Sequence, residues 1–282
     1  MGAGRSGTTL LDTILGNNPD IFSAGELNRF PKYHGLPLLV GTTSPTGIFW
    51  NEFKSKLIAK LSSDRFKTTH QLCHSFEYHS NVFKLWFPFY GKSLKRYQSY
   101  LQTFFTTLEP MVKESVIVDS SKYPMRGFYL SSLLNYDMVY IYIKRNPLDV
   151  VRSFAKKGIE QPSQGWLPAN VYMFMVNTLS IYIIRKLRKK HKTIVVLYDD
   201  LIAHPAETLA KIGRYLDIDV SHTVKLVENG QPFKKGLLFD GNRIRLENEI
   251  YLRKNETETR VEGLKDAITM AWQVIWWNKR KR

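Results

Sequence analysis

A glycine-rich opening that leads directly into an apolar helix constrains this sequence most. Residues 2–7 contain three glycines, and the next segment carries its apolar residues on one helical face: Leu10, Leu11, Ile14 and Leu15. Residues 17–19, Asn-Asn-Pro, then end that helix. A glycine turn that feeds a helix normally follows a β-strand, and only Met1 precedes it here. We therefore expect a first strand that is truncated at the N-terminus.

Three short apolar runs are typical of buried strands, namely residues 116–118, 138–143 and 194–198. Helical patterns lie between and after them, most clearly at residues 206–216. This alternation predicts an α/β fold, with a parallel sheet covered by helices on both faces. Residues from about 30 to 110 are rich in aromatic and polar side chains and predict a largely helical insertion. Because no repeat or low-complexity linker interrupts the chain, we expect a single domain over residues 1–282.

The chain is strongly basic. It has 41 lysines and arginines against 25 acidic residues, which gives a formal net charge of +16. Such an excess points to an anionic partner, which can be a nucleic acid, a membrane surface or a polyanionic small molecule. No apolar run approaches the ~18 residues of a membrane span, so we expect a soluble, cytoplasmic protein. The single cysteine, Cys73, excludes an internal disulfide and a multi-cysteine metal site.

The opening has the frame of a phosphate-binding P-loop, from Gly2 to Gly7 and on to Thr9. Thr8 stands where the lysine of that motif would reach the outer phosphates of a nucleoside triphosphate, which argues against ATP or GTP hydrolysis. Backbone N–H groups at a helix N-terminus remain. The guanidinium of Arg5 and the hydroxyls of Ser6, Thr8 and Thr9 add to them. This set suits a tetrahedral dianion or a phosphosulfate.

A second anion site is predicted after the second expected strand. Arg145 lies at the end of that strand, and Ser153 follows it by eight residues on the next expected helix. Ligands of α/β proteins bind at the carboxyl ends of strands, and an arginine fork with a hydroxyl suits a second phosphate. The alternative is that Arg145 only pairs with Asp149 at the start of the helix.

These motifs together resemble those of the sulfotransferases that use 3′-phosphoadenosine 5′-phosphosulfate (PAPS). Residues 4–9, beginning Gly4-Arg5-Ser6-Gly7, resemble their 5′-phosphosulfate loop, and residues 143–147 with Ser153 resemble their 3′-phosphate motif. Residues 197–201 are similar to a segment whose tyrosine, here Tyr198, approaches the adenine. Residues 241–245 resemble a late basic loop that closes over the nucleotide, with these residues: Asn242, Arg243 and Arg245. The resemblance implies a P-loop-like sheet and sulfuryl transfer to a hydroxyl acceptor, with the acceptor pocket in the helical insertion.

A finer resemblance concerns the catalytic residues. In the tyrosylprotein and related prokaryotic branch, a Gly-Glu pair about twenty residues after the loop arginine supplies the base, and Glu26 matches it. A carboxylate with a raised pKa can accept the proton of an acceptor hydroxyl. Lys122 resembles a lysine of that branch that, with Arg5, offsets charge on the transferred group. The alternatives are a capping or surface glutamate and a solvated lysine. His70, His74 and His79 match no motif and are expected to be surface or packing residues.

Two other function classes stay open at this point. A P-loop kinase of a small metabolite would need the missing lysine and an acidic Mg²⁺ ligand, for which Asp119 is a candidate. A nucleic-acid-binding module is favoured by charge alone, but the basic residues are spread rather than striped, so we expect no nucleic-acid partner. No His/Cys/Asp/Glu spacing is typical of a metal site. The acceptor is a glycan, lipid, phenol or peptide. The C-terminal tail, which mixes tryptophans with lysines and arginines, either contacts an anionic membrane surface weakly or packs as an amphipathic helix.

Overall fold

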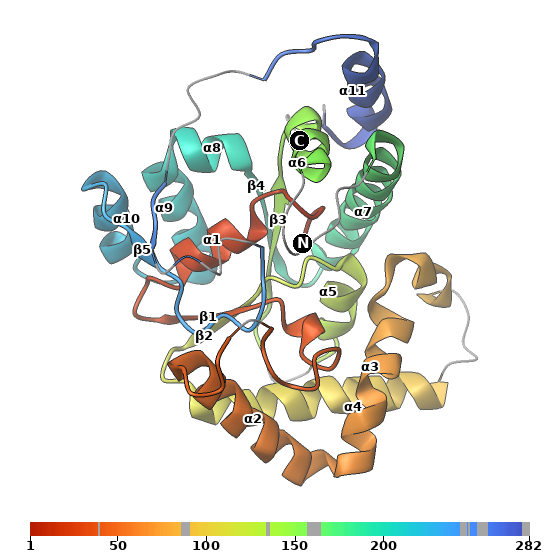
Figure 1. Cartoon of the computed structure of the whole chain (residues 1–282), viewed down its shortest axis with the longest axis vertical. Helices are drawn as coiled ribbons and strands as arrows, with labels where there is room; N and C mark the ends of the chain where they lie inside the picture. The colour runs from red at the N-terminus through yellow and green to blue at the C-terminus, as the bar shows by residue number, and fades with distance from the viewer. Residues whose placement is uncertain are drawn as a thin grey trace. The chain divides into compact units, whose positions relative to one another are not determined.

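The computed structural model describes residues 1–38, 40–85, 91–133, 136–156, 165–242, 247, 249–252 and 259–277. The chain forms two compact units, each built from separate stretches of sequence. Unit 1 comprises residues 1–8, 139–232 and 250–282, and unit 2 comprises residues 9–138 and 233–249. Figure 1 shows the helices and strands of both.

Unit 1 is built on two parallel strands, β3 (Val139–Lys144) and β4 (Lys192–Leu197), paired from Val139↔Lys192 to Lys144↔Leu197. Met1 extends this pairing, because its nitrogen donates to Ile141 O (2.6 Å) and its carbonyl accepts from Ile143 N (3.1 Å). That is the bonding of a parallel ladder. The glycine loop therefore starts beside β3. The helices of this unit are α6 (Pro147–Ala155), α7 (Trp166–Leu187), α8 (Tyr198–Ala203), α9 (Pro205–Leu216), α10 (Ser221–Glu228) and α11 (Leu264–Trp277).

Unit 2 is built on a second parallel pair, β1 (Ile21–Gly25) and β2 (Val116–Asp119). Its helices are α1 (Thr8–Leu15, whose first residue belongs to unit 1), η1 (Leu27–Arg29), α2 (Pro45–Leu61), α3 (Ser63–Glu77), η2 (His79–Leu85), α4 (Gly91–Leu108), η4 (Glu109–Met111) and α5 (Pro124–Leu130). The structure also has two short strands, β5 (Phe233–Lys234) and β6 (Glu249–Ile250).

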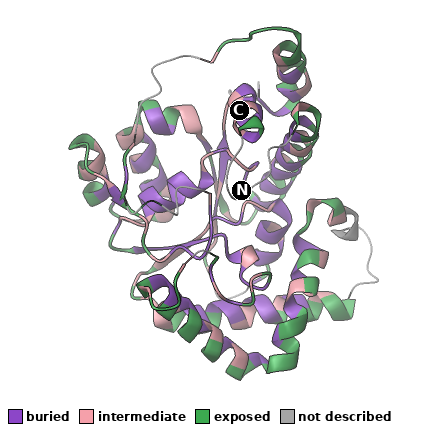
Figure 2. Ribbon diagram, in the orientation of Figure 1, coloured by how far each residue is buried: buried purple, intermediate pink, exposed green. Residues whose placement is uncertain are grey.

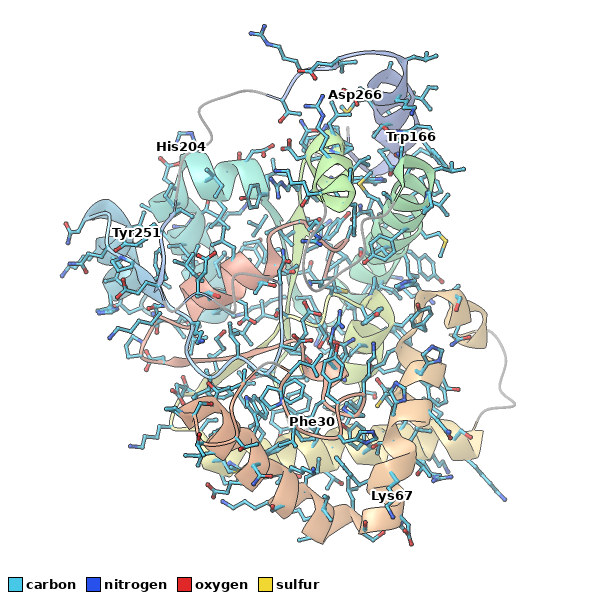
Figure 3. All side chains as sticks on the ribbon, in the orientation of Figure 1. Phe30, Lys67, Trp166, His204, Tyr251 and Asp266 are labelled. Carbon is cyan, nitrogen blue, oxygen red and sulfur yellow. The ribbon has the colours of Figure 1, made fainter. Side chains whose placement is uncertain are left out.

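The core of unit 2 is an aromatic cluster supplied largely by the helical insertion. Phe30, Trp50 and Phe53 are fully buried. The rings of Phe30 and Phe53 are 5.1 Å apart and nearly perpendicular, and Phe104 approaches both. Edge-to-face contacts of this kind stabilise a core beyond the area that they bury. Phe30 is labelled in Figure 3. Phe30 and Trp50 are thus core residues.

The three predicted strands are confirmed as β2, β3 and β4, and the α/β class with short parallel strands is confirmed with them. The insertion is helical, as predicted, with α2, α3 and α4. The strand β1 was not predicted, because its sequence Ile-Phe-Ser-Ala-Gly has neither alternation nor a run of β-branched residues. All five residues of β1 are buried, and Ser23 is accommodated by a hydrogen bond to Asp12 Oδ1 (2.5 Å).

The helix α7 is long and apolar enough, by length and composition, to cross a membrane. Within unit 1, however, α7 packs against β3, β4, α6 and α11. It also buries polar side chains, and Tyr142 on β3 donates a hydrogen bond to Asn177 Oδ1 (3.0 Å). A core helix of a globular domain has these features too, so α7 by itself is weak evidence for a span.

Candidate active site

The glycine loop of unit 1 follows a path that only small residues permit at two positions. Gly2 and Gly7 have φ angles of 144° and 94°. A Cβ atom on Gly2 would lie 2.6 Å from the carbonyl oxygen of Ile143, and one on Gly7 would lie 2.4 Å from the ring of Tyr198. The glycines therefore allow the loop to pass directly against the end of β3 and the start of α8.

Arg5, between Gly4 and Gly7 of this loop, has a left-handed backbone conformation with a φ of 67°. Its guanidinium is 5.8 Å from the ring of Phe154 on α6. The backbone nitrogen of Gly4 donates to the hydroxyl of Tyr172 on α7 (3.1 Å). Side chains from α6 and α7 thus hold the loop, and neither was identified from the sequence, because their distance along the chain hides the contact. Ser6 and Thr8 are buried at the start of α1.

Arg145 follows β3 and reaches the loop. Its Nη1 donates to the carbonyl of Arg5 (3.1 Å), and its guanidinium lies 4.2 Å from the centre of the Tyr198 ring. The predicted contact with Asp149 is present but loose, at 3.9 Å from Nε. Unit 1 therefore brings together the loop, the arginine at the end of β3 and the tyrosine at the end of β4.

Ser153 lies on α6, the helix that begins directly after Arg145. Asn146 caps this helix by accepting from the backbone nitrogen of Leu148 (3.0 Å), and Pro147 occupies its first position. Both residues favour a helix start at this place. Ser153 is half-buried and precedes Phe154, the residue that contacts Arg5. The predicted phosphate-binding serine is therefore on the helix that flanks the loop.

The late basic loop is described only at its beginning. Asn242 donates its backbone N–H to Thr9 Oγ1 (3.1 Å), and both residues belong to unit 2. A Cβ atom on Gly241 would lie 2.7 Å from Thr9 Cγ2, so this close approach requires a glycine. Arg243 and Arg245 lie outside the described residues. The structure thus brings the start of this loop to the first turn of α1.

In unit 2, the parallel pairing of β1 and β2 explains how Glu26 and Lys122 meet. The register places Gly25 opposite Asp119, so the residues that follow each strand leave the sheet at the same edge. Lys122 Nζ donates a hydrogen bond to Glu26 Oε1, and Arg29 Nε donates to Glu26 Oε2 (3.0 Å). Arg29 Nε also lies 3.2 Å from Asp240 Oδ2. Glu26 is buried and paired with two cations, neither a surface residue nor a helix cap with a side-chain bond.

The protonation of Glu26 differs from the expectation of a raised pKa. Burial would raise the pKa of this carboxyl, but the charges of Lys122 and Arg29 outweigh that effect and hold the pKa below its ordinary value. Glu26 is therefore a carboxylate at neutral pH, which is the form that can accept a proton.

The turn that carries Lys122 is fixed by its own hydrogen bonds. Asp119 Oδ1 accepts from the backbone nitrogen of Ser121 (2.9 Å) and from its hydroxyl. Ser121 Oγ accepts in turn from the backbone nitrogen of Asn28 (2.9 Å), two residues after Glu26. Lys122 has a φ of 68°, and this left-handed residue directs its side chain to Glu26. It is not a solvated lysine, since its side chain is only 17% exposed.

A buried ionic cluster behind this edge was not found from the sequence. Arg126 on α5 bonds to Glu77 Oε1 (2.6 Å) and to Asp119 Oδ2 (2.7 Å), and Tyr97 donates to Glu77 Oε1 (2.7 Å). Burial raises the pKa of Glu77, although Arg126 opposes it. The residues come from α3, α4, α5 and β2, so only the folded chain reveals the cluster.

Asp12 is another buried carboxyl, and it supports the edge of the β1–β2 pair at which Glu26 lies. Its Oδ2 accepts from the backbone nitrogen of Gly25 (3.1 Å), the residue before Glu26. Burial raises the pKa of Asp12 to about 7, although hydrogen bonds from Ser120 and Ser23 oppose the shift. An acidic residue between apolar positions on the buried face of α1 was the sequence signal that could have found it.

The histidines of the insertion pack against aromatic rings. His74 stacks on Tyr78 with ring centres 4.6 Å apart, and His79 stacks on Tyr123 at 5.2 Å. His70 lies on α3, one turn before His74. These positions agree with the expected packing or surface role. Among the described residues there is no group of three or more His, Cys, Asp or Glu side chains that could hold a metal ion.

Comparison with known proteins identifies the family. Two solved structures share the fold over 98% of this chain. One is the sulfotransferase domain of the olefin synthase of Synechococcus PCC 7002 (17% identity, 92% of that chain, TM-score 0.55), and the other is a sulfotransferase domain from the curacin biosynthetic pathway (15% identity, 95% of that chain, TM-score 0.54). No curated protein matches the sequence. The model of the sulfotransferase family matches residues 1–222, and the chain therefore belongs to the sulfotransferase family.

Proposed function

We propose that this sulfotransferase takes the sulfuryl group from PAPS and transfers it to a hydroxyl acceptor. The observation that carries the proposal is the convergence of the glycine loop, Arg145 and Tyr198 in unit 1. A loop at a helix N-terminus with an arginine suits a 5′-phosphosulfate. Arg145, which follows β3 and lies over the Tyr198 ring, suits a 3′-phosphate.

The side chain of Arg145 itself fits a nucleotide phosphate. Its Nε is buried and makes no hydrogen bond with any described residue, because Asp149 Oδ2 at 3.9 Å lies beyond hydrogen-bond distance. A buried donor without an acceptor is costly, and a phosphate oxygen would satisfy it. The Tyr198 ring and the carbonyl of Arg5 already fix the guanidinium, so little side-chain freedom is lost when an anion binds.

We assign the proton transfer to Glu26. The acceptor oxygen attacks sulfur, the bond from sulfur to the bridging phosphate oxygen breaks, and adenosine 3′,5′-bisphosphate leaves with the electron pair. The proton of the acceptor hydroxyl passes to the Glu26 carboxylate. Lys122 and Arg5 offset negative charge on the sulfuryl and bridging oxygens. In this scheme the contact between Lys122 and Glu26 keeps the base ionised before the acceptor arrives.

The proposed branch within the family is the prokaryotic and tyrosylprotein-like one. Two observations support this branch. Gly25 and Glu26 form the Gly-Glu pair, with Glu26 twenty-one residues after Arg5, and Lys122 is the hydrogen-bond partner of Glu26. The acceptor is a glycan, lipid, phenol or peptide hydroxyl, with its pocket in the insertion from about residue 30 to 110.

A comparison of Glu26→Gln with Glu77→Gln tests the catalytic assignment. Both glutamates are buried in unit 2 and paired with a cation, so the two variants share the chemical change and the loss of a buried charge. With labelled PAPS and a panel of alcohol and phenol acceptors, we expect Glu26→Gln to lower turnover by ~10²–10⁴-fold with little change in nucleotide affinity. Glu77→Gln should keep turnover. A poorly acidic alcohol that reacts at the wild-type rate with Glu26→Gln would remove Glu26 as the base.

The pH dependence adds a second test. Because the charges of Lys122 and Arg29 hold the pKa of Glu26 below its ordinary value, the wild-type rate should stay level as the pH falls through neutrality. It should decline only in acid, below the ordinary range of glutamate pKa values. A decline near pH 7 would assign the base to another group. Thermal stabilisation by adenosine 3′,5′-bisphosphate, but not by ATP with Mg²⁺ or by short DNA, separates the proposal from the kinase and nucleic-acid alternatives.

A further inference from the structure

The helix α11 has an unusual orientation, with apolar side chains facing outward. Six residues on its outer side are exposed and apolar, and they recur every three or four positions: Leu264, Ala267, Ile268, Ala271, Val274 and Ile275. Leu264 is 76% exposed and Ile275 is 55% exposed. Figure 2 shows exposed residues along α11. A surface helix of a globular domain normally buries such a stripe.

Polar contacts fix α11 in this orientation. Thr269 and Gln273 are fully buried on its inner side. Thr269 Oγ1 accepts from Trp166 Nε1 (2.8 Å) and Asn170 Nδ2 (3.2 Å), and Gln273 Nε2 donates to Asn170 Oδ1 (3.1 Å). Figure 3 labels Trp166 at the start of α7. A rotation of α11 that buried its apolar stripe would leave these polar groups without their partners, which is costly.

An ion pair holds the same helix from the side of α6. Arg152 Nη2 lies 2.6 Å from Asp266 Oδ2, and Asp266 also accepts from the backbone nitrogen of Glu262 (3.0 Å). The pKa of Asp266 is lowered by this backbone hydrogen bond and by Arg152. The outward apolar stripe is therefore a stable feature of unit 1.

The neighbouring helix α7 extends the apolar surface. Leu167, Val171 and Met175 follow one another at intervals of four residues, and each is at least 40% exposed. Phe174, next to Met175, contacts Trp272 of α11 with ring centres 6.3 Å apart, which joins the two helices. We name this set the α7–α11 apolar surface, and its members are Leu167, Val171, Met175, Leu264, Ile268, Val274 and Ile275.

The charges around this surface are mainly positive. On α7 no residue is acidic, and exposed basic residues lie at its C-terminal end and directly after it: Arg185, Lys186, Arg188, Lys189 and Lys190. On α11 the only acidic residue is Asp266, and Glu262 lies two residues before the helix; both carboxylates pair with Arg152. A second copy of this chain would also carry +16, so electrostatic complementarity favours an anionic partner.

We propose that the α7–α11 apolar surface lies on an anionic membrane surface. Exposed aliphatic side chains would enter the boundary between headgroups and acyl chains, and the flanking lysines and arginines would contact anionic headgroups. At 14 residues α11 is shorter than the ~20 residues of a span, and α7 buries polar side chains against β3. The contact is therefore peripheral. It does not depend on the identity of the sulfuryl donor.

Vesicle sedimentation with the full chain tests the proposal. We compare vesicles of phosphatidylcholine alone with vesicles that contain phosphatidylserine as well. We expect binding to the anionic vesicles only, and a weaker binding in high salt because the electrostatic contribution is screened. The double variant Ile268→Ser/Ile275→Ser should lower the partition coefficient at least about tenfold.

The matched control is Ile48→Ser on α2 of unit 2. Ile48 is 57% exposed, close to the 55% of Ile275, but it is not part of the α7–α11 apolar surface. This variant should bind anionic vesicles like the wild type, and thermal melting checks that all variants are folded. Absent binding, or an equal loss in Ile48→Ser, would overturn the proposal. The proposal would also be overturned if the wild type did not bind vesicles but formed a dimer, and if the double variant were monomeric. The α7–α11 apolar surface would then bind a second copy of the chain.

Discussion

Replacement of Arg145 by alanine should weaken binding of adenosine 3′,5′-bisphosphate far more than binding of adenosine 5′-monophosphate. A charge-assisted hydrogen bond contributes about 1.5–3 kcal/mol, which corresponds to a loss of about 10- to 150-fold. Because Tyr198 and the carbonyl of Arg5 already hold the guanidinium, we expect the upper part of that range. The variant also loses the bond to the Arg5 carbonyl, so the monophosphate should lose roughly fivefold, the value of an ordinary hydrogen bond.

Isothermal titration calorimetry with the two nucleotides measures this difference directly. Arg152→Ala is the matched control. Arg152 lies on α6, the helix that follows Arg145, but it pairs with Asp266 and not with the glycine loop. It should leave both affinities unchanged. An equal loss of both nucleotides in Arg145→Ala would refute the assignment of this arginine to the 3′-phosphate, and would leave it a structural support of the loop.

Two further predictions follow from close contacts in the two units. Gly7→Ala should lower nucleotide affinity at least about tenfold by calorimetry, because a Cβ atom there would lie 2.4 Å from the Tyr198 ring at a φ of 94°; wild-type affinity in this variant would contradict the loop geometry. Arg126→Met should lower the free energy of unfolding in urea by about 3–5 kcal/mol at pH 8, since Glu77 and Asp119 lose their buried cation. Arg126 opposes the rise of the Glu77 pKa, so its loss raises that pKa further, and the folded variant takes up a proton more readily than the folded wild type. The deficit should therefore shrink as the pH falls, and a deficit that grew in acid would reject this explanation.

The elements of unit 1 that gather around the glycine loop were predictable because local signals define them. The glycine loop, the helix after it and the ends of β3 and β4 each have a signal within a few residues, and Arg145 is identified by its place at a strand end. The structure places the loop, Arg145 and Tyr198 together, as the motifs implied. Their assignment to a nucleotide stays a prediction until binding is measured.

The environment of Glu26 could not be predicted in the same way. Its partner Lys122 is 96 residues away, and their contact depends on the register of β1 against β2. Because β1 has no clear strand signal, the two cations beside the carboxyl could not be predicted, and the pKa of Glu26 was expected to rise rather than fall. The buried carboxyl Asp12 and the cluster around Arg126 depend on the same tertiary contacts.

Two residues that the proposed mechanism uses have left-handed backbone conformations, which has a consequence for protein engineering. Arg5 and Lys122 have φ angles of 67° and 68°, which cost roughly 1 kcal/mol or more each for a residue with a Cβ atom. Glycine at either position would relieve that backbone strain. At position 122 that gain is outweighed, because the buried Glu26 carboxylate would lose one of its two cations. A selection for thermal stability alone would therefore enrich glycine at position 5, and under the proposed mechanism it would remove a cation that offsets charge during sulfuryl transfer. Stabilised variants of this enzyme should be chosen with both positions held fixed.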